Sequence, residues 1–386
     1  MNKPMTGIDT RLIHAGEPEP RIEGAVSMPI FQSSTFEYRG EDSYYALRYI
    51  RLNNTPNHVA LHRKLAAIEG AEAALVTASG MAAVATTLMT LAGAGQRLMA
   101  QDCLYGGTHD LMRGEFARLK IAVDFVDGAN AASWRESLTP ETRAIYVETI
   151  SNPLMQVPDL RAAVAFARTH GLISIIDNTF ASPVNFRPAE IGFDLSVHSA
   201  TKYLNGHSDI VAGAVIGRLD LIEKINRTLS HLGGSLDPHA CFLLHRGLKT
   251  LGVRVRHQNA SAMEIARYLA AHPKVTAVNY PGLEADAGHA RARELFDGFG
   301  GMMSFALRGG VEAADRFIDH LTIPISAPSL GGVESLITRP AQTSHSGMPR
   351  AERERAGIGD GLIRLSVGLE ATADLIADFS RALEAC

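Results

Sequence analysis

Two ionisable side chains, Asp177 and Lys202, stand 25 residues apart in the chain, each just beyond a short apolar run. The first run is rich in isoleucine and spans residues 173–176. The second spans residues 195–197 and is followed by a serine and a threonine. In an α/β protein such runs are the buried strands of a parallel sheet, and functional side chains gather where those strands end. We therefore expect Asp177 and Lys202 to share one crevice.

A lysine opposite an acid, with hydroxyl groups beside the lysine, is the arrangement that pyridoxal phosphate requires. The Lys202 amine would form the Schiff base, Asp177 would keep the pyridine nitrogen protonated, and Ser199 and Thr201 would help to hold the phosphate. Taken singly, a loop-capping aspartate, a solvated lysine and hydroxyls that satisfy local backbone explain the same residues. Their combination favours the cofactor.

The sequence segments that contain Asp177 and Lys202 are specific enough to indicate a protein family. The segments DNTFASP at 177–183 and HSATKYLNGHSDIVAG at 198–213 closely resemble the Cys/Met-metabolism family of pyridoxal phosphate enzymes. This family includes cystathionine γ-synthases, cystathionine β- and γ-lyases and methionine γ-lyases. The similarity runs from RLIHAG at 11–16 to IRLSVGLE at 363–370, essentially the whole chain. It implies the α/β architecture of fold type I: a large domain with a doubly wound, mainly parallel sheet and a smaller C-terminal α+β domain.

Length and composition agree with such an enzyme. A chain of 386 residues exceeds one ordinary domain, so two domains and an arm are expected. Apolar residues make up 46% and charged residues 20%, which is typical of a soluble globular protein and argues against disorder. The net charge is only −4 and no basic cluster occurs, so a nucleic-acid partner is not expected.

The cysteines and histidines show no ligand spacing. Cys103, Cys241 and Cys386 are scattered and odd in number, which suits reduced thiols in the cytoplasm, and no HExxH motif occurs, so no metal site is expected. The first residues lack the pattern of a secretory signal. Residues 73–96 carry no charge, but glycines interrupt them, so a strand, turn and helix are expected here and not a membrane span.

Residues 1–54 are predicted to form an irregular arm, because they are mixed, polar and without a period. By resemblance, Tyr49 and Arg51 form the family's Tyr-x-Arg motif, which binds the cofactor phosphate of a neighbouring subunit. An arginine fork and a phenol can both donate to a phosphate. The same resemblance implies a homotetramer, a dimer of dimers with shared active sites. Without it, an ordinary aromatic and basic pair on an exposed arm explains both residues.

Residues 55–247 alternate apolar runs with helical patterns and are predicted to form the cofactor domain, with helices on both faces of its sheet. One helix is expected over 159–170, because Asp159 precedes an apolar face and Gly171 follows it. The predicted strands are Ala73–Thr77, Arg97–Gln101, Ile121–Val126, Arg143–Thr149 and Leu172–Ile176.

The turn Ser79-Gly80-Met81 follows a predicted strand and opens a helix, so its N–H groups would face an anion at the positive end of the helix dipole. Such a turn is common in α/β proteins. The resemblance identifies it as the family's Ser-Gly-Met phosphate turn. Neither GxGxxG nor GxxxxGK[ST] occurs, so a nucleotide is not indicated.

Two further residues of this domain are placed by the resemblance. Tyr105 would stack on the pyridine ring, and its hydroxyl would act as a base toward the incoming amino acid, two roles that a phenol suits. Asn152 would bind the phenolic oxygen of the cofactor and help to hold the substrate, although a turn-forming Asn-Pro pair explains it equally well. Methionine γ-lyases carry a cysteine where this chain has Gly107, which weakens that particular reading.

Residues 248–386 are predicted to form the smaller domain, which opens with a long helix over about 252–271. By resemblance, Arg364 binds the substrate α-carboxylate bidentately, and Ser329 lies next to it. A guanidinium matches the two oxygens of a carboxylate, but a structural salt bridge is a serious competing explanation for Arg364. Pro328 replaces a glutamate that is frequent in cystathionine γ-lyases and γ-synthases. A distal ammonium group would then need another partner, or the substrate has none.

These residues predict a pyridoxal phosphate enzyme in which the freed Lys202 amine moves the substrate's α-proton. The expected activity is β- or γ-elimination from a sulfur-containing amino acid such as cystathionine. The alternative is γ-replacement on an O-acylhomoserine, as in a cystathionine γ-synthase. A catalytically idle binding or regulatory protein with this fold would be expected to lack some of Tyr105, Asp177, Lys202 and Arg364, and all four are present.

Overall fold

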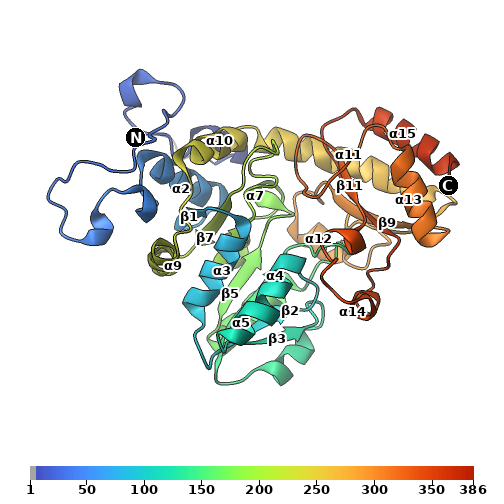
Figure 1. The fold of residues 1–386 in the computed structure, drawn as a ribbon, viewed down its shortest axis with the longest axis horizontal. Helices are drawn as coiled ribbons and strands as arrows, with labels where there is room; N and C mark the ends of the chain where they lie inside the picture. Colours follow the sequence, from blue (N-terminus) through green and yellow to red (C-terminus); the bar gives the residue numbers. More distant parts are fainter. Residues whose placement is uncertain (1–5) are drawn as a thin grey trace.

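The computed structural model describes residues 6–386. Its strands form two sheets, one from the middle of the chain and one from the C-terminal part, as the colours in Figure 1 show. The strands are β1 Ala73–Thr77, β2 Arg97–Gln101, β3 Ala122–Val126, β4 Thr142–Glu148, β5 Ile173–Asp177, β6 Leu195–His198, β7 Gly213–Gly217, β8 Val275–Asn279, β9 Met302–Leu307, β10 Ile325–Ser326, β11 Leu336–Thr338 and β12 Leu362–Ser366.

The larger sheet has the strand order β1-β7-β6-β5-β4-β2-β3. Strands β3, β2, β4, β5 and β6 are parallel, which confirms the predicted α/β class. Strand β7 runs antiparallel to both β1 and β6. The connection from β6 to β7 contains no crossover helix, and adjacent strands joined in this way must run in opposite directions. Lys202 lies in this connection.

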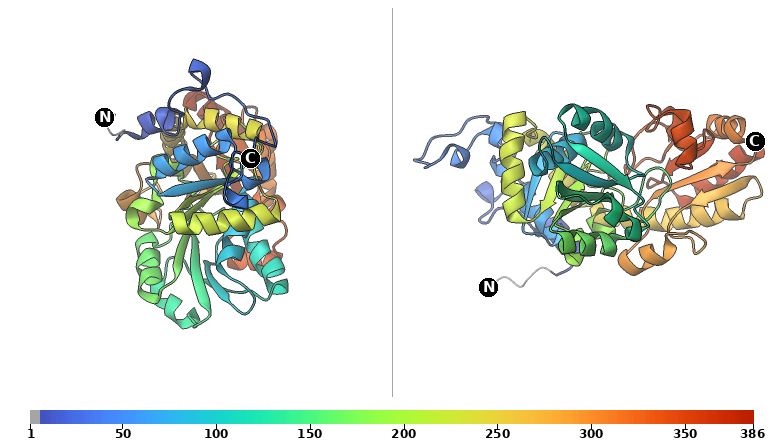
Figure 2. Two further views of the ribbon diagram at one scale, coloured as in Figure 1. Left: turned by 90° about the vertical axis from the view of Figure 1, so that its left-hand side faces the viewer. Right: turned by 90° about the horizontal axis from the view of Figure 1, so that it is seen from below.

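Helices cover both faces of the larger sheet, as expected for a doubly wound domain (Figures 1 and 2). One apolar cluster joins α2, α6 and α10 to the sheet, and a second joins α3, α5 and α9 to its other face. The helices of this part are α2 Pro56–Glu69, α3 Gly80–Leu91, α4 Gly106–Asp110, α5 Phe116–Arg118, α6 Leu160–His170, α7 Ser182–Asn185, α8 Pro188–Ile191, α9 Leu219–Leu232 and α10 Pro238–Leu248.

Helix α6 illustrates how local sequence sets these bounds. The Asp159 side chain accepts a hydrogen bond from the Ala162 N–H, and Gly171 ends the helix with a φ of +66°. Glycine adopts this left-handed conformation without strain, because it has no Cβ atom. The predicted helix over 159–170 is confirmed.

The arm is less irregular than predicted. Helix α1, Ile8–His14, packs against α2, and Leu12 is 1% exposed. The fully buried Lys64 amine donates to the carbonyl oxygens of Leu12 at 2.9 Å and Ile13 at 3.1 Å, so a side chain from α2 satisfies the end of α1. The prediction of an arm without regular structure was therefore wrong at its start, because the partners of α1 come from the body of the domain.

The smaller sheet has the order β10-β11-β12-β9-β8 and packs against α11, α13 and α15 through one apolar cluster. The arm and this part of the chain lie at opposite ends of the molecule (Figure 2). No helix in residues 6–386 is long and apolar enough to cross a membrane. The domain limits at 54/55 and 247/248 stay predictions. The remaining helices are α11 Leu251–Ala271, α12 His289–Leu295, α13 Gly310–His320, α14 Arg350–Arg355 and α15 Thr372–Glu384.

Candidate active site

A cavity of about 620 Å³ lies where the carboxyl ends of β4, β5 and β6 meet residues of the smaller domain. All of the predicted site residues except Tyr49 and Arg51 line it. Open α/β sheets bind ligands at this edge. The predicted residues on its wall are Ser79, Gly80, Met81, Tyr105, Asn152, Asp177, Ser199, Thr201, Lys202, Ser329 and Arg364.

Lys202 is held by a contact from the smaller domain. Its Nζ donates to Ser329 Oγ at 2.7 Å, and no carboxylate in residues 6–386 forms an ion pair with it. Burial, and then the neighbouring Arg364, lowers the pKa of Lys202 to about 8. A solvated surface lysine would show neither feature. The lowered pKa gives the amine the neutral fraction that a nucleophile or base needs.

Ser329 has a φ of +104°, outside the usual range for a residue with a side chain. Such a conformation costs on the order of 1–3 kcal/mol and persists only where the surroundings hold it. The strain accompanies the contact of its hydroxyl with Lys202 and of its carbonyl oxygen with Arg364.

Asp177 ends β5 and faces the cavity. Its Oδ1 accepts the Thr179 N–H at 2.9 Å, and its Oδ2 accepts the Tyr146 hydroxyl at 3.3 Å. Burial raises the pKa of Asp177, whereas the hydrogen bonds from Thr179 and the nearby His198 oppose that rise. Asp177 is therefore an oriented acceptor that suits a protonated ring nitrogen.

The first turn of α3 forms a cradle for an anion. Ser79 Oγ accepts the Ala82 N–H at 3.0 Å, and the N–H groups of Gly80 and Met81, which line the cavity, have no acceptor within the helix. A Cβ on Gly80 would lie 2.8 Å from the Cβ of Ser199, so only glycine lets Ser199 approach this turn. The cradle fits a phosphate group.

Thr201 behaves differently from Ser199. Its Oγ1 donates to the Ala212 carbonyl at 3.2 Å and accepts the Ala212 N–H at 3.0 Å, so its hydroxyl satisfies local backbone. Thr201 lines the cavity, but its hydroxyl proton is already donated to the Ala212 carbonyl oxygen. The structure thus favours the local explanation for this hydroxyl.

Tyr105 precedes α4 and is 44% exposed, with its ring at the cavity wall. Its backbone N–H donates to Glu148 Oε1 at 2.6 Å. A Cβ on Gly107 would lie 2.7 Å from Cε1 of the tyrosine ring, so the glycine leaves the ring its present position. The ring is available to stack on a flat ligand.

Arg364 lies on β12 and is only 5% exposed. Its Nη1 donates to Asn152 Oδ1 at 3.0 Å and its Nη2 to the Ser329 carbonyl at 3.3 Å. No carboxylate of residues 6–386 pairs with it, and burial lowers its pKa to about 10. A structural salt bridge within the described chain is therefore ruled out. A buried guanidinium without an acid has the donors and the charge to bind a carboxylate.

Tyr49 and Arg51 lie on the arm and away from this cavity. Arg51 Nη1 donates to the Ser230 carbonyl at 3.0 Å, and Nη2 bonds to the Tyr44 hydroxyl. Tyr49 is 37% exposed. In a single chain, therefore, the pair does not complete the phosphate cradle. Their contact with a neighbouring subunit stays a prediction.

Sequence reasoning missed Glu148, which ends β4 as Asp177 ends β5 and lines the same cavity. The signal was available, since the predicted strand over 143–149 contains a single acid close to its end. The family resemblance identifies Asn152, in the loop after this strand, and not Glu148.

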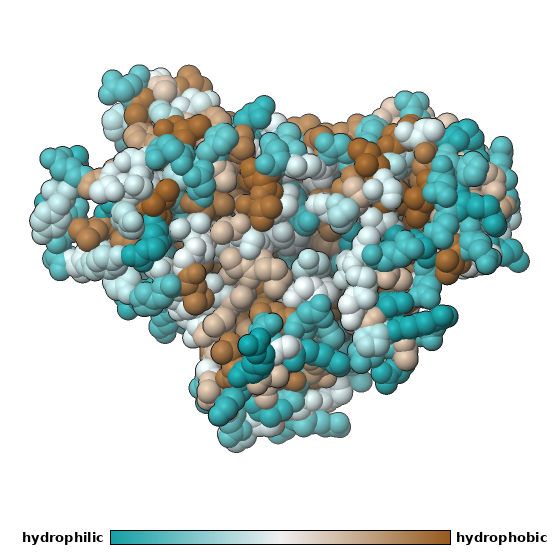
Figure 3. All heavy atoms as spheres, viewed as in Figure 1, coloured by the Kyte–Doolittle hydropathy of each residue, from teal (hydrophilic) through white to brown (hydrophobic). Residues whose placement is uncertain are grey.

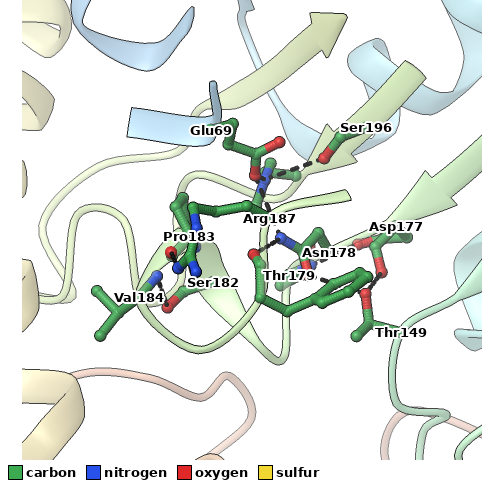
Figure 4. Close-up of polar contacts among 12 residues, drawn as sticks. Glu69, Thr149, Asp177, Asn178, Thr179, Ser182, Pro183, Val184, Arg187 and Ser196 are labelled. Carbon is green, nitrogen blue, oxygen red and sulfur yellow. Dashed lines mark hydrogen bonds and ion pairs between the residues drawn. The ribbon is translucent and has the colours of Figure 1, made fainter. Parts of the chain in front are cut away.

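A buried polar network lies beside Asp177 (Figure 4). Thr149 donates to Asn178 Oδ1 at 2.8 Å, and the Asn178 amide donates to Glu69 Oε1 at 3.2 Å. The same oxygen lies 2.5 Å from His198 Nε2. Because Glu69, Asn178 and His198 are at most 1% exposed, this network fixes the loop that follows Asp177.

Comparisons with known proteins agree with this geometry. A cystathionine β-lyase of Lactococcus lactis subsp. cremoris (strain MG1363) is 41% identical and covers 98% of this chain and 100% of its own. An L-methionine γ-lyase of Fusobacterium nucleatum subsp. polymorphum is 40% identical and covers 98% of both. The structure of cystathionine γ-synthase from Xanthomonas oryzae pv. oryzae superposes with a TM-score of 0.95 at 38% identity, over 99% of this chain and 98% of that one.

The fold and the site together define a pyridoxal phosphate-dependent enzyme, with an amine, an acid and an anion cradle around one cavity. The model of the family "Cys/Met metabolism PLP-dependent enzyme" matches residues 9–384. The chain belongs to this family.

Proposed function

We propose that this protein is a lyase that eliminates the β- or γ-substituent of a sulfur-containing amino acid of the cystathionine type. The products are a 2-oxo acid, ammonia and a thiol. The observation that carries the proposal is the unpaired Arg364 guanidinium, which opens into the same cavity as the Lys202 amine. The similarity to enzymes named cystathionine β-lyase and L-methionine γ-lyase supports it.

The residues of the chain divide the work. Arg364, oriented by Asn152 and the Ser329 carbonyl, binds the α-carboxylate and so presents the Cα–H bond inside the cavity. Lys202 Nζ, with a pKa of about 8, is partly neutral near neutral pH and accepts the α-proton. When bound, pyridoxal phosphate supplies the electron sink for the resulting charge. Asp177 provides the negative charge that favours protonation of its ring nitrogen.

One part of the cavity wall consists of neutral residues. Pro328, Leu330, Thr343 and Val211 lie there, and among the described lining residues the only acids are the strand-end residues Glu148 and Asp177. A distal ammonium group therefore finds no carboxylate from this chain beyond those two. Cystathionine, which has such a group, would therefore need a carboxylate supplied by a neighbouring subunit, whereas methionine would not.

The activity is tested by incubating the purified protein separately with cystathionine and methionine and measuring 2-oxo acid, ammonia and thiol. Formation of all three supports the lyase. The alternative is γ-replacement on an O-acylhomoserine, which the likeness to a cystathionine γ-synthase favours. If neither substrate is cleaved while an O-acylhomoserine and cysteine yield cystathionine, the alternative holds. A protein that stays colourless after cofactor addition would instead be an idle member of the family.

The proposal includes a homotetramer in which Tyr49 and Arg51 bind the phosphate in a neighbouring subunit. The arm supports this, because Val26, Tyr38 and Tyr44 are more than half exposed on it, and apolar residues stand among polar ones there (Figure 3). Mixing Arg51→Ala with Lys202→Ala subunits tests it: restored activity requires that one subunit contribute to the site of another. The three free cysteines favour a cytoplasmic location.

A further inference from the structure

Glu148 and Asp177 form a pair of carboxyl groups in the wall of the cavity. They are directly opposite one another in the parallel register of β4 and β5, each at the last residue of its strand. Residues opposite one another in neighbouring strands point to the same face of a sheet. Glu148 is 5% exposed, so little water separates this carboxyl from its surroundings.

The two carboxyls receive unequal support. Asp177 accepts hydrogen bonds from the Thr179 N–H and the Tyr146 hydroxyl. The Glu148 carboxyl accepts the backbone N–H groups of Tyr105, at 2.6 Å, and of Asn152, whereas the Thr179 side chain also hydrogen-bonds to Asp177. No lysine, arginine or histidine of residues 6–386 forms an ion pair with either group. Two neighbouring carboxylates in a dry site cannot both stay ionised, and the less supported group keeps a proton.

The surrounding charges point in the same direction. Burial, and then Asp177, raises the pKa of Glu148 well above its ordinary range. His198, on the Asp177 side of the pair, lowers the pKa of Asp177 and so favours the charge on that carboxyl. The other titratable groups that face the pair are Cys103 after β2, Tyr105 before α4, Tyr146 on β4, and Lys202 and Arg364 across the cavity.

We propose that Glu148 is a positioning residue that works with its proton in place. One carboxyl oxygen holds the backbone of Tyr105, and the retained proton leaves the single negative charge of the pair on Asp177. Glu148 thus fixes the position of Tyr105 and keeps Asp177 charged, so that both would be ready to hold the cofactor, without touching the reacting atoms itself. This inference rests on the proposed cofactor chemistry, in which Asp177 must be ionised.

Infrared spectroscopy tests the proton on Glu148 directly. The difference is taken between holoenzyme that contains ¹³C-carboxyl-labelled glutamate and the unlabelled holoenzyme. We expect a carbonyl band of a protonated glutamic acid at neutral pH that is missing in Glu148→Gln and present in Glu69→Gln, the matched buried control. Absence of the band from the wild-type protein overturns the proposal, and so does its persistence in Glu148→Gln. The wild-type spectrum decides even if a variant does not fold.

A second measurement separates positioning from simple structural support. Glu148→Gln keeps the acceptor for Tyr105 and the neutral charge, so the visible absorption of the bound cofactor should keep its wild-type pH dependence. Glu148→Ala frees Tyr105 and should lower kcat/KM by about 100-fold, with the larger part of the loss in kcat. A shifted pH dependence in Glu148→Gln overturns the proposal. A wild-type protein that binds no cofactor but shows the infrared band would instead overturn only the proposed function.

Discussion

Arg364 Nη1 donates a hydrogen bond to Asn152 Oδ1 at 3.0 Å, although 212 residues separate the two in the chain. Arg364 belongs to β12 of the smaller sheet, and Asn152 belongs to the loop that follows β4 of the larger one. The bond therefore joins the two sheets at the cavity. It also presents the guanidinium without neutralising it, because an amide oxygen carries no charge.

Replacing Arg364 by lysine should raise KM for the amino acid about 10- to 100-fold, because a charged hydrogen bond contributes about 1.5–3 kcal/mol and lysine cannot bind a carboxylate through two parallel donors. Steady-state kinetics measure the change, and the cofactor absorption should stay that of the wild type. Arg339→Lys is the matched control, since Arg339 is also buried but is paired with Asp315. An unchanged KM in Arg364→Lys would contradict the assignment.

Lys202→Met should abolish turnover and also change how stability depends on pH. Its pKa of about 8 in the folded protein lies below the value of 10.5 for a free lysine, so the unfolded chain binds more protons between these values. The wild-type protein freed of cofactor should therefore gain up to about 3 kcal/mol relative to Lys202→Met as pH rises through this window. Urea denaturation at a series of pH values measures the difference. Parallel curves would show that Lys202 is not buried as described.

Ser79→Ala should cost about 1 kcal/mol of stability through the lost helix cap and should weaken retention of the cofactor. Asp159→Ala removes the equivalent cap of α6, far from the anion cradle, and should cost a similar stability without affecting the cofactor. Thermal melting and dialysis against phosphate buffer, followed by absorption, separate the two effects. Equal cofactor loss from both variants would argue against an anion cradle at α3.

Glu69→Ala should destabilise the fold by about 3–5 kcal/mol, because it removes the buried carboxylate that pairs with His198 and that the Asn178 amide contacts (Figure 4). Glu294→Ala is the contrast, since the Arg161–Glu294 pair is more than half exposed and such pairs contribute about 0–1 kcal/mol. Chemical denaturation measures both. Similar small losses in the two variants would mean that the network in Figure 4 does not hold the loop after Asp177.

Much of the architecture could be predicted from local patterns. The apolar runs at 73–77 and 97–101 are strands with the predicted ends, and the cap and the glycine of α6 stand where expected. These features depend on neighbouring residues alone. Helix α1 and the reversed direction of β7 were not predicted, because the first depends on Lys64 from another helix and the second on how a loop closes.

The candidate site divides in the same way. Asp177 and Lys202 could be paired because each follows a strand of one sheet. The position of Glu148 near a strand end was visible in the sequence, but its place opposite Asp177 and its bond to Tyr105 depend on other segments of the chain. Similarly, the lack of an acid beside Arg364 depends on every element around it, so a sequence pattern alone could not rule out a salt bridge.

The seam between the sheets has a practical consequence for redesign. The anion cradle lies at the start of α3 and Asp177 ends β5 of the larger sheet, whereas Pro328 and Ser329 lie between β10 and β11 and Arg364 on β12 of the smaller sheet. Cofactor binding and substrate preference therefore depend largely on different segments of the chain. Variants with substitutions confined to residues 328–344 should keep the bound cofactor and its yellow colour, while their preference among amino-acid substrates changes.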